Sequence, residues 1–349
     1  MIPRLLRPLL VSVALLLTSS VQAAGKLPPH CLSECTPRIG IVAAFGAEAD
    51  ILLAQTRARR VWTINGKRFT SGVLRGNRVV IVLSGVSMVN AAMSTQLLLD
   101  HFRIERLILS GIAGGVNPAS HVGDVVVPER WAMPMEVYWN GDGSVPAACG
   151  QPGAIECLGL KLARGADGRP FPEYRIGGQS TGLFMRDNAV QRTASPPEGE
   201  FRFDYLADPA MLAVAREIRP VLDTCGPRSP VQCVSSQPVL RVGGRAVSAT
   251  AFLANPEYRR YLFDTLQAEA IDMETAALAH VAYANQVPFI AFRSLSDLAG
   301  GDDFTDVGAF FGSGLAERNE ASVTLSFLEA WARQPPERAQ ANRRAATKP

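Results

Sequence analysis

The sequence of 349 residues has little of what marks a metal site, a disordered chain or a membrane protein. It has only four scattered histidines and no Cys-x-x-Cys pair, so we predict neither a metal nor an organic cofactor. Hydrophobic residues make up 47% and charged residues 19%, a balance that excludes disordered and low-complexity chains. After residue 17, no apolar run approaches the length of about 20 residues that crosses a bilayer. These absences leave a folded chain of one large domain, or at most two.

Basic residues are concentrated at the two ends of the chain. The formal net charge is +3, with Arg4 and Arg7 near the N-terminus and a net charge of +4 within residues 333–349. The span between them is therefore mildly acidic. Since nucleic-acid binding needs basic residues clustered on the folded surface, we expect no nucleic-acid partner. The polar, basic tail is predicted to be disordered.

The first 23 residues have the layout of a cleaved secretory signal. Two arginines precede the apolar run 8–17, and the small residues Val21 and Ala23 stand at positions −3 and −1 of a cleavage site. An uncleaved membrane anchor is the alternative, but roughly 10 to 12 apolar residues are too few to span the hydrocarbon core. We expect cleavage after Ala23, an exported protein that is periplasmic or secreted, and no membrane contact after cleavage. Residues 24–37 form a lead-in.

Six cysteines follow the signal in three closely spaced pairs: Cys31 with Cys35, Cys149 with Cys157, and Cys225 with Cys233. In an oxidising compartment, even numbers and short spacing favour local disulfides that close small loops, although spacing alone leaves the connectivity open.

Between residues 38 and 332, buried-strand patterns alternate with helical patterns, which predicts one three-layer α/β/α sandwich around a mixed, mostly parallel sheet. Strands are expected at 38–45, 61–85 (several short ones), 106–110, 122–128, 245–251, just before 272, and 287–294. Helices are expected at 47–57, 87–101, 209–222, 256–266, 274–285 and 315–331. The glycine-rich segment 111–115 is expected to be a turn, and two loop-rich insertions are expected at about 139–204 and 225–238.

Charged residues follow several of the expected strands, where ligands of open α/β sheets bind. They are Glu48, Asp272, Glu274, Arg293 and Asp297. Each one alone is explained by helix capping or a structural ion pair. Together they indicate a functional site, because several ionisable groups at one sheet edge cost desolvation energy that structure rarely requires.

Five motifs occur in order along residues 38–331. They are IGIVAAFGAE (39–48), SGIAGG (110–115) with VGDVVV (122–127), SATAF (248–252), IDMETAA (271–277) and RSLSD (293–297). In this order the chain resembles the methylthioadenosine/S-adenosylhomocysteine nucleosidases of the nucleoside phosphorylase superfamily. The resemblance implies the fold of that superfamily and a homodimer. It also implies hydrolysis of the N-glycosidic bond of an adenine nucleoside, which is a small-molecule substrate.

The resemblance also implies roles for individual residues. Asp297 matches the general acid at the purine N7, so burial should raise its pKa. Glu48 matches the carboxylate that activates the attacking water, and Glu274 matches the group that holds the ribose hydroxyls. Arg293 matches an arginine close to that water. Further substrate-binding candidates are Phe252, which is equally well explained as a core phenylalanine, Met273, Ser296, Phe45, Ala113 and Gly114.

Two alternatives remain beside hydrolysis: a phosphate-dependent nucleoside phosphorylase, and a non-catalytic exported storage or binding protein. No lysine or arginine occurs from Gly111 through Asp124, where the phosphorylases keep a phosphate-binding arginine, and Glu48 would repel phosphate. Retention of four charged site residues disfavours a storage role. Gly46 and Ala47 depart from the family pattern, and insertion 139–204 stands where the family builds its 5′-substituent pocket.

Overall fold

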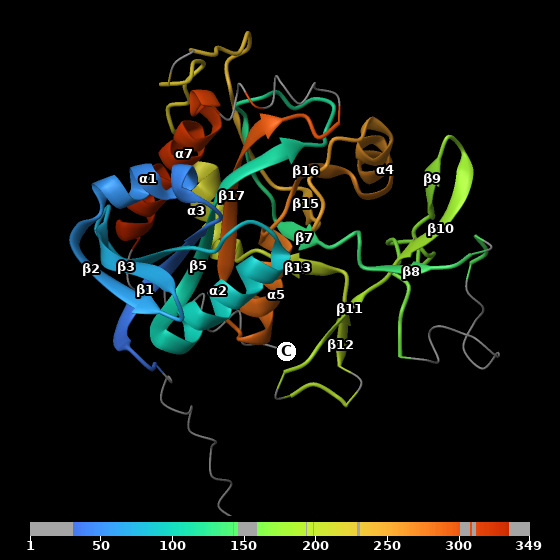
Figure 1. Ribbon diagram of the computed structural model, residues 1–349, viewed down its shortest axis with the longest axis horizontal. Helices are drawn as coiled ribbons and strands as arrows, with labels where there is room; N and C mark the ends of the chain where they lie inside the picture. Colours follow the sequence, from blue (N-terminus) through green and yellow to red (C-terminus); the bar gives the residue numbers. More distant parts are fainter. Residues whose placement is uncertain are drawn as a thin grey trace, which may run out of the picture.

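The computed structural model describes residues 31–141, 143–145, 159–192, 194–197, 199–228, 231–300, 308 and 312–334. A central sheet runs through the body of the molecule, with helices on both of its faces (Figure 1). The predicted α/β/α sandwich with a mixed, mostly parallel sheet is therefore confirmed. The expected signal, the C-terminal tail, Cys149 and Cys157 lie outside the described residues.

The central sheet has the strand order β13-β7-β15-β16-β5-β1-β4-β3-β2, and β17 joins β5 to β6, which pairs with β14. Its strands are β1 (Glu34–Ala43), β2 (Arg57–Ile64), β3 (Lys67–Leu74), β4 (Asn77–Leu83), β5 (Phe102–Gly115), β6 (Val125–Val127), β7 (Arg130–Ala132), β13 (Asp204–Leu206), β14 (Leu240–Val242), β15 (Arg245–Ser248), β16 (Ala268–Asp272) and β17 (Phe289–Asp297). The pairs β4–β1, β1–β5 and β5–β17 are parallel, so these strands end at the same edge.

Among the described residues, six helices cover the sheet. They are α1 (Gly46–Gln55), α2 (Met88–His101), α3 (Pro209–Glu217), α4 (Pro256–Leu266), α5 (Thr275–Ala284) and α7 (Leu315–Ala332). Helix α7 packs against α1 and α3, whereas α2 packs against α5. The expected N-cap of α3 is confirmed, because Asp208 accepts a hydrogen bond from the Met211 amide at 2.9 Å with Pro209 following it. None of the described helices combines the length and the apolar character needed to span a membrane.

The glycine-rich segment 111–115 is a strand and not the expected turn. Strand β5 continues through it to Gly115 and pairs with β17 over most of its length. Glycine content suggested a turn, but here small residues let other groups approach the strand closely. Several element boundaries also differ; for example, α1 ends at Gln55, shortly before β2 begins at Arg57, and α3 ends at Glu217, before Pro220.

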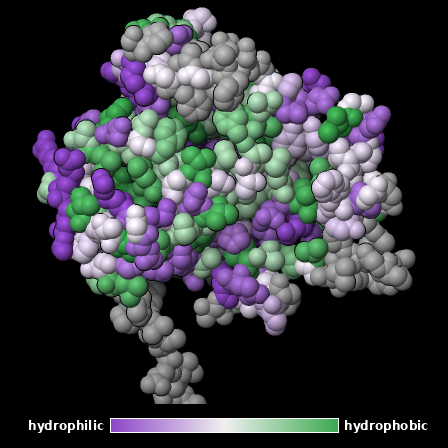
Figure 2. Space-filling model, viewed as in Figure 1, coloured by the Kyte–Doolittle hydropathy of each residue, from purple (hydrophilic) through white to green (hydrophobic). Residues whose placement is uncertain are grey.

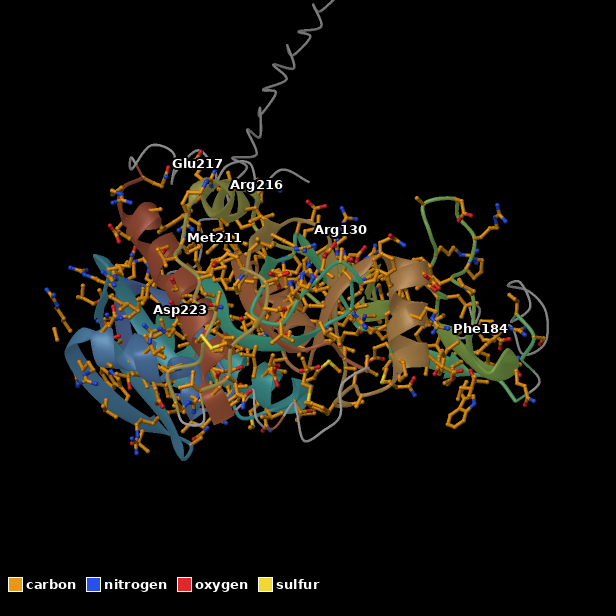
Figure 3. All side chains as sticks on the ribbon, turned by 90° about the horizontal axis from the view of Figure 1, so that it is seen from above. Arg130, Phe184, Met211, Arg216, Glu217 and Asp223 are labelled. Atoms are coloured by element: carbon orange, nitrogen blue, oxygen red, sulfur yellow. A yellow bond between two sulfur atoms is a disulfide. The ribbon has the colours of Figure 1, made fainter. Side chains whose placement is uncertain are left out.

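The insertion at about 139–204 contains more regular structure than its composition predicts. Its described part forms a small sheet of β8 (Val137–Trp139), β9 (Tyr174–Ile176) and β10 (Gln179–Met185), and a hairpin of β11 (Asn188–Val190) and β12 (Glu200–Arg202). Both stand to one side of the body (Figure 1). Figure 3 shows Phe184 of this sheet at the opposite end of the molecule from Asp223, and its side chain is buried in a small separate apolar cluster.

Two of the three expected disulfides fall among the described residues, and both are present. Cys31 is bonded to Cys35, and Cys225 is bonded to Cys233 across the second insertion. Each closes a short loop, as the spacing predicted.

Candidate active site

Six chain segments meet in one cavity of about 200 Å3 at the carboxyl ends of the strands. It is lined by Ala44, Phe45, Glu48, Val86, Ile112, Ala113, Gly114, Ala251, Phe252, Leu253, Ile271, Asp272, Met273, Glu274, Ser296 and Asp297. All the predicted site residues line this cavity except Arg293. Among the described residues, neither a lysine or arginine nor any residue of the two insertions takes part in the lining.

Arg293 lies directly beneath the cavity and is completely buried in β17. Its guanidinium contacts three carboxylates: Nε lies 2.7 Å from Asp272 Oδ2, Nη2 3.0 Å from Glu274 Oε2, and Nη1 3.6 Å from Glu48 Oε1. Nη1 also donates to the carbonyl of Ile112 at 3.1 Å. Burial alone would lower the pKa of Arg293, but the three carboxylates raise it above its ordinary value. One buried cation thus holds three acids together.

Gly111 makes this packing possible. A Cβ atom on Gly111 would lie 2.3 Å from Arg293 Nη1 and 2.4 Å from Glu48 Oε1, so one of these buried side chains would have to shift. The glycine lets the strand backbone pass beside the ion pair without that displacement.

Glu48 stands in the first turn of α1 and is 1% exposed. Its Oε2 accepts hydrogen bonds from the amides of Ala44 and Phe45 at 2.5 and 3.3 Å, and Oε1 accepts from the Ile112 amide at 3.0 Å. Burial raises the pKa of Glu48 to about 7, against the opposing effects of Arg293 and the amides. A carboxylate that exchanges a proton near neutral pH is suited to general base chemistry.

Glu274 and Asp272 hold the other side of Arg293. Glu274 Oε1 accepts from the Ser87 amide at 2.8 Å, and burial raises the pKa of Glu274 despite the nearby guanidinium. Asp272 accepts hydrogen bonds from the hydroxyls of Ser248 and Thr275. Asp272 and Glu274 are thus both held by hydrogen bonds, and both line the cavity.

Asp297 ends β17 on the opposite wall and is 6% exposed. The Ser296 hydroxyl donates to Asp297 Oδ2 at 2.9 Å, and the Ala299 amide donates to Oδ1 at 2.8 Å. Gly114 leaves room for this carboxyl, because a Cβ there would lie 2.8 Å from Oδ1. The Ser296 hydroxyl and the Ala299 amide thus hold the Asp297 carboxyl in place.

Apolar groups form the remaining wall. Phe252 is 48% exposed in the loop after β15, so it is not the buried core phenylalanine that we considered as an alternative. Phe45, Met273 and Ala113 line the cavity beside it. Carboxyl groups and apolar groups in one cavity suit a ligand that carries both hydroxyls and a flat ring.

The sequence analysis missed three contributors. Ser87, which adopts a positive φ of 88°, offers its amide to Glu274, and no motif marks such a backbone donor. Val86 lines the cavity from the same turn. Glu320 of α7 is fully buried, and burial followed by the charge of Glu48 raises its pKa well above the usual range. The sequence did offer one sign of this burial: Glu320 lies on the apolar face of α7, close to Val323 and Thr324.

Comparisons with known proteins agree with this geometry. A family model described as the phosphorylase superfamily matches residues 38–328. A 5′-methylthioadenosine/S-adenosylhomocysteine nucleosidase of Bacillus cereus strain G9842 is 28% identical over 265 residues, which cover 75% of this chain and 87% of that protein.

Two solved structures share the fold. The 5′-methylthioadenosine/S-adenosylhomocysteine nucleosidase of Streptococcus pneumoniae with the transition-state inhibitor MT-ImmA superimposes with a TM-score of 0.57 at 23% identity, covering 85% of this chain and 100% of that one. The futalosine hydrolase of Helicobacter pylori gives a TM-score of 0.54 at 18% identity, covering 84% and 97%.

Proposed function

The chain belongs to the phosphorylase superfamily, and from that premise we propose that it is an exported nucleosidase that hydrolyses the N-glycosidic bond of an adenine nucleoside such as methylthioadenosine or S-adenosylhomocysteine. The observation that carries the proposal is the placement of Glu48, Glu274 and Asp297 around a single cavity. The similarity to nucleosidases over three quarters of the chain supports it.

The chemistry divides between the two walls of the cavity. Asp297 delivers a proton to the departing purine, which stacks on Phe252. Glu274 holds the ribose hydroxyls and places negative charge beside the developing ribosyl cation. Glu48 removes a proton from the water that attacks the anomeric carbon. The products are the free base and the ribose derivative.

Hydrolysis is favoured over phosphorolysis by the surroundings of Arg293. Its nitrogens are already engaged by Asp272, Glu274, Glu48 and a backbone carbonyl. Among the described residues, no lysine or arginine lines the cavity. A phosphate dianion entering it would meet carboxylates and find no free positive partner.

Export and self-association belong to the same proposal. The disulfides Cys31–Cys35 and Cys225–Cys233 support an oxidising compartment, as the N-terminal signal pattern does. We propose a homodimer on the resemblance to the nucleosidases. N-terminal sequencing of the exported chain tests cleavage after Ala23, and analytical ultracentrifugation tests the dimer.

The decisive assay measures adenine release from methylthioadenosine by the purified chain, with and without phosphate. We expect phosphate-independent release, and a loss of about 10²- to 10⁴-fold in kcat for Asp297→Asn, the effect of removing a general acid. Asp264→Asn, an exposed aspartate on α4, is the matched control and should keep full activity.

Each other outcome would overturn a defined part of the proposal. Release that requires phosphate would make the protein a phosphorylase. An unchanged rate in Asp297→Asn would remove the general acid. No release from methylthioadenosine, S-adenosylhomocysteine or other purine nucleosides would leave the storage or binding role.

A further inference from the structure

An arginine-rich surface lies at the β2 edge of the central sheet, the end of the strand order opposite β13. Between Asp50 and Asp100 the chain has no acidic residue. The same stretch holds seven basic residues, namely Arg57, Arg59, Arg60, Lys67, Arg68, Arg75 and Arg78. Five of them are exposed near one end of β2–β4, and we call this group the arginine corner: Arg57, Arg59, Arg60, Arg75 and Arg78.

The strand register brings these side chains together. Arg57 and Arg78 are the two partners of Val73, one on each neighbouring strand, and adjacent strands lie about 4.8 Å apart. Arg75 follows in the turn between β3 and β4. Figure 2 shows hydrophilic side chains along the left edge of the molecule, where β2 lies in Figure 1.

The positive charge of the arginine corner is not neutralised within the described part of the chain. Arg75 donates to Gln55, Arg59 donates to the carbonyl of Leu53, and the guanidinium of Arg60 lies over the Trp62 ring. None of the five arginines has an ion pair there. Two acids on adjoining elements already have partners, since Glu34 pairs with Arg38 and Glu329 pairs with Arg333.

Both ends of the described chain reach this side of the molecule. Strand β4 begins at Asn77 and runs parallel to β1, so the corner lies at the amino ends of the strands, opposite the cavity. Helix α7 ends beside it: Asn77 Nδ2 donates to the Leu328 carbonyl at 2.7 Å, and a Cβ on Gly76 would lie 3.3 Å from Ala332 Cβ. The segment 333–349, with its net charge of +4, is therefore attached at the arginine corner.

We propose that the arginine corner is an electrostatic docking surface for an anionic lipid bilayer. Guanidinium groups form paired hydrogen bonds with phosphate oxygens, and clusters of basic residues near a membrane surface each add to its attraction. Val73 is 38% exposed between Arg57 and Arg78 on the same face of the sheet, which suits a headgroup layer. This proposal replaces the expectation of no membrane contact after signal cleavage, because that expectation considered only apolar segments and not the exposed charges of the folded body.

A bilayer fits the surface better than a nucleic acid does. Single-stranded nucleic acids bind to exposed aromatic rings in a basic groove. Here Trp62, the aromatic residue of β2, is covered by Arg60, and the surface is a sheet edge rather than a groove. Docking by the corner leaves the cavity facing away from the membrane.

The test is co-sedimentation of the chain, expressed with its own leader, with vesicles of phosphatidylcholine alone or mixed equally with phosphatidylglycerol. We expect binding only to the mixed vesicles, weakening as salt screens the charges. The triple variant Arg57→Gln/Arg75→Gln/Arg78→Gln should bind about 100-fold more weakly, at about fivefold for each arginine. The matched control Arg169→Gln/Arg175→Gln/Arg260→Gln removes the same charge from exposed sites and should bind normally.

Nucleoside cleavage by each variant reports whether it is folded. Equal weakening in the two triple variants would overturn the proposal, since net charge and not the corner would then decide binding. Absence of binding to the mixed vesicles would overturn it as well. Tighter binding to duplex DNA or RNA than to the mixed vesicles, lost in the corner variant, would assign the surface to nucleic acid instead.

Discussion

Arg293 and the arginine corner place the same guanidinium group in opposite surroundings. Arg293 is fully buried among Asp272, Glu274 and Glu48, whereas the exposed arginines of the corner have no carboxylate partner among the described residues. Arg293 cannot leave its partners without stranding charges in a low dielectric. An exposed arginine loses little by changing partners, because water already solvates it. Burial therefore makes one arginine part of a fixed site and leaves the others available to a ligand.

Of the substitutions that test this contrast, Arg293→Met should have the largest effect on stability and activity. It leaves three acids buried without a cation, which should cost about 3–5 kcal/mol of unfolding free energy and abolish activity. The loss should be smaller at pH 5 than at pH 8, because the remaining acids can take up protons at the lower pH. Urea unfolding at both values measures it.

The control is Arg245→Met, which removes an arginine that is 18% exposed and bonded to Asp204. We expect a smaller loss that changes less between the two pH values. An Arg293→Met penalty as large at pH 5 as at pH 8 would contradict the view that this guanidinium compensates ionised carboxylates.

Glu48→Gln tests the acid closest to Arg293 Nη1. With a pKa of about 7, Glu48 is ionised above neutral pH, so kcat/KM should fall as the pH drops below about 7. The variant should lose about 10²- to 10⁴-fold in kcat, and its residual rate should lack this acidic limb. Asp50→Asn changes an exposed acid on the same helix and should keep both the parent kcat and the acidic limb of the pH profile. If kcat/KM of Glu48→Gln still falls as the pH drops below about 7, the titrating group is not Glu48.

Glu320→Gln should stabilise the protein by about 1 kcal/mol at pH 8. The pKa of this buried acid is raised, so its ionisation costs folding energy once the pH exceeds its unfolded value, and that cost is absent at low pH. Thermal unfolding of variant and parent should converge near pH 5. Glu317→Gln is the contrasting control: Glu317 bonds to Arg228 at 2.9 Å, so the variant should lose stability. If Glu320→Gln were less stable than the parent at pH 8, the claim that ionisation of buried Glu320 costs folding free energy would be contradicted.

The corner variant Arg57→Gln/Arg75→Gln/Arg78→Gln should show the smallest effect on folding. Exposed substitutions of this kind usually change the unfolding free energy by less than about 0.5 kcal/mol each. Separation of like charges can even raise the stability slightly at low salt. Chemical unfolding at low and high salt gives the comparison, and a loss as large as that of Arg293→Met would mean that the corner has a structural role.

The sequence predicted the fold where hydrophobic periodicity and capping agree. Pro256–Leu266 begins and ends as expected, because Asn255 caps it and a left-handed Gln267 closes it. Residues 111–115 were assigned wrongly, since glycine serves both turns and close approaches. Most insertion strands were missed because segments of three residues, such as Tyr174–Ile176, are too short to show a period. The longer strand Gln179–Met185 was missed because its buried residues do not alternate regularly.

The site was predictable to the extent that the strand-end rule applies. It collected Glu48, Glu274 and Asp297 at one edge, and the structure brings them to one cavity. It could not indicate that Arg293 lies beneath the cavity and not in its wall. Ser87 and Glu320 reach the site from elements outside any motif, so only three-dimensional packing shows their part.

Gly111 couples the evolution of one small residue to two charged residues that are distant in sequence. A Cβ at position 111 would lie 2.3 Å from Arg293 Nη1 and 2.4 Å from Glu48 Oε1, so a larger residue there must displace one of those side chains. Both side chains are buried, and their bridge would have to rearrange. A substitution at this position is therefore expected to be accompanied by changes at position 48 or 293.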